Sequence, residues 1–136
     1  MSTSPQNYQI RVFYEDTDAG GIVYYANYLK FFERARTEWL RELGINQSIF
    51  LQQNIGFVVR KVTTDYLASA KLDNLLTVKS EIRQLKRSSM VFFQQIVDQD
   101  QKLICQAEVV VVCVDLSKAK PCATPEPILG VLKRVS

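Results

Sequence analysis

The segment Tyr14–Leu29, with the sequence YEDTDAGGIVYYANYL, places charge and backbone freedom directly before an aromatic-rich stretch. Its acidic residues are Glu15, Asp16 and Asp18, and its two adjacent glycines are Gly20 and Gly21. Because glycine lacks a Cβ atom, the backbone at these two positions can take unusual dihedral angles and let a ligand approach closely. We expect an acidic turn here, with a helix starting immediately after it.

A long amphipathic helix is predicted behind this turn. Apolar side chains recur at spacings of three and four residues, at Tyr28, Phe32, Ala35, Trp39 and Leu43. This spacing places them on one face of a helix, and Gly44 supplies a C-terminal stop. The opposite face is charged, and we expect an ion pair between Arg34 and Glu38, one turn apart.

Strands are predicted on both sides of this helix. Gln9–Tyr14 alternates between two faces, with Tyr14 expected on the same face as Ile10 and Val12. Further strands are predicted at residues 55–67 (with an irregularity near Lys61), 76–85, 90–97 and 102–116, and short helices at 48–53 and 128–133. One long helix and about five strands predict an α+β fold, in which an antiparallel sheet wraps around the helix.

Composition bounds the kind of protein. The chain has 136 residues and is 47% hydrophobic, so we expect one domain spanning residues 1–136. The net charge of +3 comes from dispersed basic residues, which argues against nucleic acid as a partner. No stretch approaches the ~20 apolar residues of a membrane span, and the first residues do not resemble a signal segment. We therefore expect a cytoplasmic protein without membrane insertion.

The absence of histidine restricts the available chemistry. With no histidine in the sequence, Ser-His and Cys-His nucleophile pairs are excluded, as is a histidine base. The three cysteines, Cys105, Cys113 and Cys122, lack the close-paired spacing of a zinc site, so we expect neither a metal nor a cofactor. Cys105 and Cys113 lie in an apolar run and are predicted to be reduced core residues, with a reactive thiol as the alternative.

The run Val109–Val114 is apolar on both faces of its predicted strand. A single covered face of a sheet does not require this, so we expect a second subunit to bury the outer face in a homodimer. The alternative is a second layer within the chain, although no unassigned helix is large enough to form it.

The acidic turn has two interpretations. The free N–H groups at the start of the long helix form a site for negative charge, yet Asp16 and Asp18 would repel a bound anion. The arrangement suits an anion that exists only transiently, such as the oxygen of an attacked carbonyl. Alternatively, these are ordinary turn and capping residues, Glu15 is a solvated side chain, and the nearby aromatics belong to the core. That aromatic run comprises Tyr24, Tyr25, Tyr28, Phe31 and Phe32.

The segment from Tyr14 to Trp39 resembles the signature of hotdog-fold acyl-CoA thioesterases of the 4-hydroxybenzoyl-CoA thioesterase type, most closely the Tol-Pal-associated branch. Residues 57–61, 65–70 and 107–115 also resemble that branch, so the similarity covers nearly the whole chain. It implies a hotdog homodimer, often paired into a dimer of dimers, with the active site at the subunit interface. It also implies an acyl-CoA substrate, with an acyl carrier protein as the other possible carrier.

The resemblance assigns roles to two residues. Asp18 matches the essential carboxylate, which acts as nucleophile or as general base for water. The backbone N–H of Tyr25 matches the donor that polarises the thioester carbonyl, and Gly20 and Gly21 leave room for the thioester. The Tol-Pal-associated branch usually has histidine at position 25, whereas the aryl-CoA branches use an aromatic residue there. Activity is therefore compatible with Tyr25, but the resemblance does not specify whether the acyl preference of the Tol-Pal-associated branch carries over.

The remaining assignments concern CoA and the competing functions. Basic and hydroxyl side chains near predicted turns are candidates for its phosphates, namely Arg60, Lys61, Lys86, Arg87 and Ser88. A thiolate leaves readily without a general acid, which favours a thioester over an ester or amide. A hotdog dehydratase would need the missing histidine. A non-catalytic acyl-CoA sensor is the main alternative, although binding alone does not require Asp18.

Overall fold

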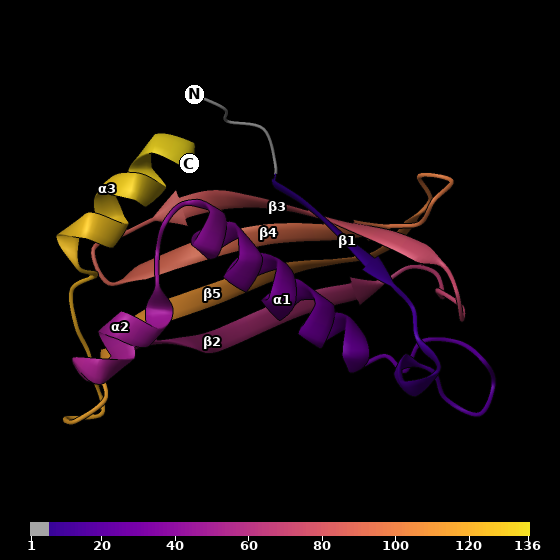
Figure 1. Cartoon of the computed structure of the whole chain (residues 1–136), viewed down its shortest axis with the longest axis horizontal. Helices are drawn as coiled ribbons and strands as arrows, with labels where there is room; N and C mark the ends of the chain where they lie inside the picture. The colour runs from indigo at the N-terminus through magenta and orange to yellow at the C-terminus, as the bar shows by residue number, and fades with distance from the viewer. Residues whose placement is uncertain (1–5) are drawn as a thin grey trace.

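The structure is a computed structural model, and it describes residues 6–136. One antiparallel sheet, in the order β1-β3-β4-β5-β2, wraps around helix α1 (Figure 1). The elements are β1 (Gln6–Arg11), the 3-10 helix η1 (Tyr14–Asp16), α1 (Asn27–Glu42), α2 (Gln47–Gln52), β2 (Ile55–Tyr66), β3 (Leu75–Leu85), β4 (Ser89–Val97), β5 (Leu103–Asp115), β6 (Lys120–Pro121) and α3 (Glu126–Val135). The α+β fold predicted from the sequence is confirmed.

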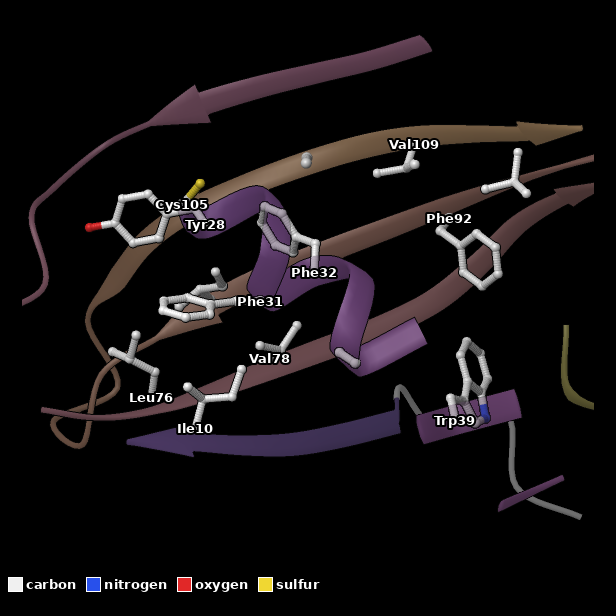
Figure 2. Packing of buried hydrophobic residues seen from close by; sticks show 14 of the residues in the cluster. Ile10, Tyr28, Phe31, Phe32, Trp39, Leu76, Val78, Phe92, Cys105 and Val109 are labelled. Atoms are coloured by element: carbon white, nitrogen blue, oxygen red, sulfur yellow. The ribbon is translucent and has the colours of Figure 1, made fainter. Parts of the chain in front are cut away.

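Helix α1 packs its apolar stripe against the sheet. Phe31 and Phe32 are almost completely buried, and the ring of Trp39 lies 6.1 Å from that of Phe92 on β4 (Figure 2). The helix ends at Glu42, and Gly44 follows with a φ of +83°, a conformation that favours glycine. The predicted spacing and stop of this helix are therefore confirmed.

The first strand ends earlier than its alternating pattern predicts. Strand β1 stops at Arg11, and Tyr14, which was expected on a buried face, is 82% exposed. The cause is the Asp16 carboxylate, which accepts a hydrogen bond from the Phe13 N–H at 2.9 Å and folds the chain back into η1. The prediction of a strand through Tyr14 is wrong because this turn overrides the alternation.

The predicted ion pair on α1 is also wrong. Glu38 pairs with Arg41, one turn towards the C-terminus, rather than with Arg34. The Arg34 guanidinium lies 6.0 Å from the centre of the Phe31 ring. Glu38 has a basic residue on either side at helical spacing, and the sequence alone does not determine which one it contacts.

Strand β2 forms one edge of the sheet and carries the exposed apolar side chains Val58, Val59 and Val62. Its pairing with β5 shifts between Val59 and Lys61, which confirms the predicted irregularity. On β5, Val112 is 7% exposed within the single chain, whereas Val110 and Val114 on the same face are half-buried. Among residues 6–136, no helix is long and apolar enough to cross a membrane.

Candidate active site

The acidic turn folds into two arms that pair with each other. The Asp16 carbonyl accepts from the Tyr24 N–H at 3.0 Å, and the Asp18 N–H donates to the Ile22 carbonyl at 2.9 Å. At the tip, the Gly21 N–H donates to the Asp18 carbonyl at 3.0 Å. This pairing brings Asp18, on the first arm, alongside the second arm, which leads into α1.

The Asp18 carboxylate lies over the glycines at the tip of the turn. Its Oδ1 accepts from the Gly20 N–H at 2.8 Å, and the side chain is exposed. A Cβ atom on Gly20 would lie 3.3 Å from that same oxygen, while Gly21 has a φ of +77°. Gly20 therefore leaves room for the carboxylate, and Gly21 supplies the left-handed backbone conformation of the turn.

Tyr25 lies in the turn immediately before α1. Its carbonyl accepts from the Tyr28 N–H at 3.4 Å as the helix begins. Within residues 6–136, the Tyr25 N–H donates to no acceptor. An unpaired N–H at the start of a helix is a donor available to a partial negative charge.

The rings of Tyr25, Tyr28 and Tyr66 lie next to one another, and we call this group the aromatic wall. The predicted aromatic run divides into two groups. Tyr24 and Tyr25 are exposed, whereas Tyr28 and the two phenylalanines behind it are buried. The ring of Tyr66, at the end of β2, lies 5.8 Å from Tyr25 and 5.9 Å from Tyr28. Tyr66 was not a predicted site residue. Its sequence signals are its position at the end of a predicted strand and its place in the stretch 65–70 that resembles the thioesterase branch.

Two hydrogen bonds through Ala70 connect the aromatic wall to the acidic turn. The Tyr28 hydroxyl accepts from the Ala70 N–H at 3.0 Å, and the Ala70 carbonyl accepts from the Val23 N–H at 2.9 Å. Burial raises the pKa of Tyr28, and burial with the nearby Cys105 raises the pKa of Tyr66. Both phenols therefore stay neutral at pH 7.

The basic candidates lie away from this turn within one chain. Lys86, Arg87 and Ser88 form the β3–β4 hairpin, at the opposite end of the sheet from the acidic turn (Figure 1). On β5, the partner of Ser89 is seven residues beyond the partner of Tyr66, or about 23 Å at the rise of a strand. Arg60 and Lys61 lie at the irregularity of the β2 edge, between these two ends.

A cavity lined in part by apolar side chains is also separate from Asp18. It has a volume of about 270 Å³ and lies between α1, the sheet and α3, with Arg36, Phe57, Val59, Phe92 and Ile128 among its lining residues. None of its lining residues belongs to the turn at 16–25. In the part of the chain that the structure describes, no three His, Cys, Asp or Glu side chains cluster as metal ligands.

Comparison with known proteins identifies the family. The thioesterase-like superfamily matches residues 12–132. The acyl-CoA thioester hydrolase YbgC of Escherichia coli O6:H1 is 46% identical over 134 residues, which is 98% of this chain and 100% of that protein.

Two solved structures are also similar. A probable thioesterase from Bartonella henselae is 34% identical with a TM-score of 0.80, covering 90% of this chain and 99% of that one. A gentisyl-coenzyme A thioesterase is 28% identical with a TM-score of 0.84, covering 93% and 98%. The chain therefore belongs to the thioesterase-like superfamily and is a thioesterase with the hotdog fold predicted from its sequence.

Proposed function

We propose that this chain hydrolyses acyl-CoA thioesters to a free acid and CoA, with Asp18 as the catalytic carboxylate. One observation carries the proposal: the exposed Asp18 carboxylate lies on a turn that leads into the unpaired N–H of Tyr25. The similarity to an E. coli acyl-CoA thioester hydrolase supports acyl-CoA as the substrate class. The aromatic wall of Tyr25 and Tyr66 favours small, medium or aryl acyl groups.

In the proposed reaction, the thioester carbonyl oxygen accepts a hydrogen bond from the Tyr25 N–H, which stabilises the negative charge that develops there. Asp18 then acts in one of two ways. It attacks the carbonyl carbon and expels CoA thiolate, leaving an anhydride that water hydrolyses, or it takes a proton from a water molecule that attacks directly. Because a thiol has a pKa of about 8.5, the thiolate leaves without a histidine acid.

The decisive experiment is hydrolysis of short, medium, long and aryl acyl-CoAs by wild type and Asp18→Asn, followed by loss of thioester absorbance. We expect kcat to fall by about 100-fold or more in the variant. Because Asp18 is exposed, the variant should unfold at the same urea concentration as wild type. Asp100→Asn, in the β4–β5 turn, is the matched control and should keep full activity.

Near-normal turnover by Asp18→Asn would contradict the assignment. A wild-type protein that binds CoA esters but hydrolyses none would instead be the acyl-CoA sensor. A single turnover in ¹⁸O-labelled water tests for the nucleophilic role, because label in Asp18 itself would establish it. A nucleophile acquires ¹⁸O in its own carboxylate when water attacks the anhydride at the aspartyl carbonyl, whereas a base leaves the label only in the product acid.

We further propose a homodimer built on β2, paired into a dimer of dimers. Strand β2 offers an unpaired edge with Val58, Val59 and Val62 exposed, and an edge of this kind pairs readily with a second strand. Val62→Lys should therefore shift the sedimentation coefficient towards the monomer. Leu51→Lys, a comparably exposed residue on α2, is the control and should not. An unchanged assembly in Val62→Lys would place the interface elsewhere.

In this dimer, the CoA ester cleaved at Asp18 of one copy would have its phosphates bound by Arg60 and Lys61 of the other copy. Subunit mixing tests this. Asp18→Asn and a double Arg60→Glu, Lys61→Glu variant should each be weak alone, and mixed dimers should recover activity because one intact composite site forms. No recovery on mixing would mean that each site is formed by one chain.

The proposed compartment is the cytoplasm, where free thiols stay reduced, and an acyl carrier protein is the alternative carrier.

A further inference from the structure

Asp16 is a buried carboxylate directly beside the proposed site. Its side chain is 6% exposed, although it lies two residues from the exposed Asp18. Its Oδ2 accepts from the Phe13 N–H at 2.9 Å, and its Oδ1 accepts from the Asn27 side-chain amide at 3.0 Å. A buried carboxylate is costly unless such bonds satisfy it, so both oxygens are committed to holding the chain.

The groups that Asp16 holds come from separate parts of the site. Phe13 leads out of β1, and Asn27 is the first residue of α1. The Asp16 carbonyl also accepts from the Tyr24 N–H at 3.0 Å. Asp16 therefore fixes the start of α1, and with it Tyr25, relative to the arm that carries Asp18.

Within residues 6–136, no cation forms an ion pair with this carboxylate. The ion pair found among residues 6–136 joins Arg41 and Glu38, far from the turn. The bonds at Asp16 are therefore directional contacts to two neutral donors rather than a charge pair. Such contacts set geometry, and displacing a catalytic group by about 1 Å can reduce a rate by about 100-fold.

We propose that Asp16 is a positioning residue for the thioesterase reaction: through Phe13, Asn27 and Tyr24 it holds the Tyr25 N–H in place opposite Asp18, without contacting the substrate. This inference rests on the proposed function. The competing assignment makes Asp16 the chemical carboxylate and Asp18 a turn residue. The burial of Asp16 and the commitment of both of its oxygens argue against that exchange.

Exchanging the partners of the Asp16–Asn27 bond tests the proposal. In Asn27→Asp, two carboxylates face each other, and we expect kcat to fall by about 10- to 100-fold with KM little changed. In Asp16→Asn, the new amide oxygen can still accept from Phe13, and the Asn27 amide can rotate to accept from the new NH₂ group. This variant should stay within about threefold of wild type.

The double variant Asp16→Asn, Asn27→Asp restores the bond with donor and acceptor exchanged, so it should recover the kcat that Asn27→Asp loses. Asn46→Asp is the matched control, because Asn46 caps α2 through its Oδ1 and the same substitution there also adds a carboxylate at a helix start. That control should leave kcat and KM unchanged. The backbone amide shifts of Phe13 and Tyr25 provide a second readout, moving in Asn27→Asp and returning in the double variant.

Each outcome has a defined meaning. Wild-type kcat in Asn27→Asp, or no recovery in the double variant, would overturn the positioning role while leaving the proposed function intact if Asp18→Asn is inactive. Loss of turnover in Asp16→Asn with normal turnover in Asp18→Asn would exchange the two roles and overturn both proposals. If the wild type hydrolyses no thioester, the proposed function fails, and the amide shifts alone decide whether the Asp16–Asn27 bond holds Tyr25 in place.

Discussion

Gln94 on β4 joins the sheet to α1 through Arg36: its Oε1 accepts from the Arg36 Nη1 at 2.9 Å, and both side chains are buried. The Gln94 amide nitrogen donates to the Phe32 carbonyl at 3.0 Å and to the Ser80 hydroxyl at 2.9 Å. Burial lowers the pKa of Arg36, with Glu33 acting in the opposite direction. A single glutamine thus holds a buried guanidinium, a helix carbonyl and the neighbouring strand together.

Replacing Gln94 with leucine should lower the free energy of unfolding by about 3 kcal/mol. The substitution leaves the Arg36 charge buried without its acceptor, and this penalty exceeds the gain in apolar burial. The measurement is urea unfolding. Gln95→Leu is the control, because Gln95 lies on the other face of β4 and its side chain donates to the Gln106 side chain at 3.2 Å. It should cost less than about 1 kcal/mol, and equal losses in the two variants would refute the role given to Gln94.

Two substitutions at Tyr25 separate its side chain from its backbone. Tyr25→His keeps the N–H and should keep hydrolysis within a few-fold of wild type, with a shift in acyl preference. Tyr25→Pro removes the N–H and should reduce kcat by about 100-fold, as loss of an oxyanion donor does. Steady-state kinetics, with circular dichroism as the folding check, tests both. Abolished turnover in the histidine variant would show that the ring itself takes part.

Gly21 and Gly130, two of the glycines with open space around them, should respond to alanine in opposite directions. Gly21→Ala forces a side chain into a φ of +77°, which should cost about 1–2 kcal/mol of unfolding free energy and lower kcat, because Asp18 shares the turn. Gly130→Ala, within α3, meets no atom within 4 Å and has no positive φ, so it should add about 0.5–1 kcal/mol. Equal effects in the two variants would show that backbone conformation is not the cause.

Stability should fall in alkali because of Cys105. Burial, with a contribution from Asp65, raises the pKa of this thiol from 9.0 to about 12. Above pH 9 the unfolded chain therefore releases a proton that the folded chain retains, and the free energy of unfolding decreases as the pH rises towards 12. Urea midpoints measured between pH 8 and 11 test this. Cys105→Ala should lose some stability at pH 8 through packing, and the gap from wild type should narrow with rising pH. A constant gap would contradict the shifted pKa.

The pattern of residue types correctly predicted the parts of this fold that depend on residues close together in the sequence. The apolar spacing of α1 and the glycine that ends it could be recognised because these signals involve residues only a few positions apart. The 3-10 turn at Tyr14–Asp16 escaped prediction because the bond that forms it runs from the Phe13 N–H to the Asp16 side chain, and the alternation of residue types does not reveal such a bond. The choice of Arg41 over Arg34 as the partner of Glu38 likewise depends on side-chain positions that spacing leaves open.

In the candidate site, too, some residues could be predicted from the sequence and others could not. Asp18 and Tyr25 are close in sequence, so the motif that contains them could be recognised as a unit. Tyr66 comes beside Tyr25 only because β2 ends next to the start of α1, and sequence separation conceals that contact. The distance of Lys86 and Arg87 from Asp18 depends on strand register, which alternation of residue types does not specify.

The exposed edge of β2 has a practical consequence for anyone assaying this enzyme. If catalysis requires two copies joined along Val58, Val59 and Val62, then dilution separates the copies and specific activity becomes a property of protein concentration. Progress curves at low enzyme would show a lag or a gradual loss of rate, which saturating substrate would suppress by mass action. The polar and charged residues interspersed along that strand, including Arg60, Lys61 and Asp65, would meanwhile keep the separated copies from aggregating.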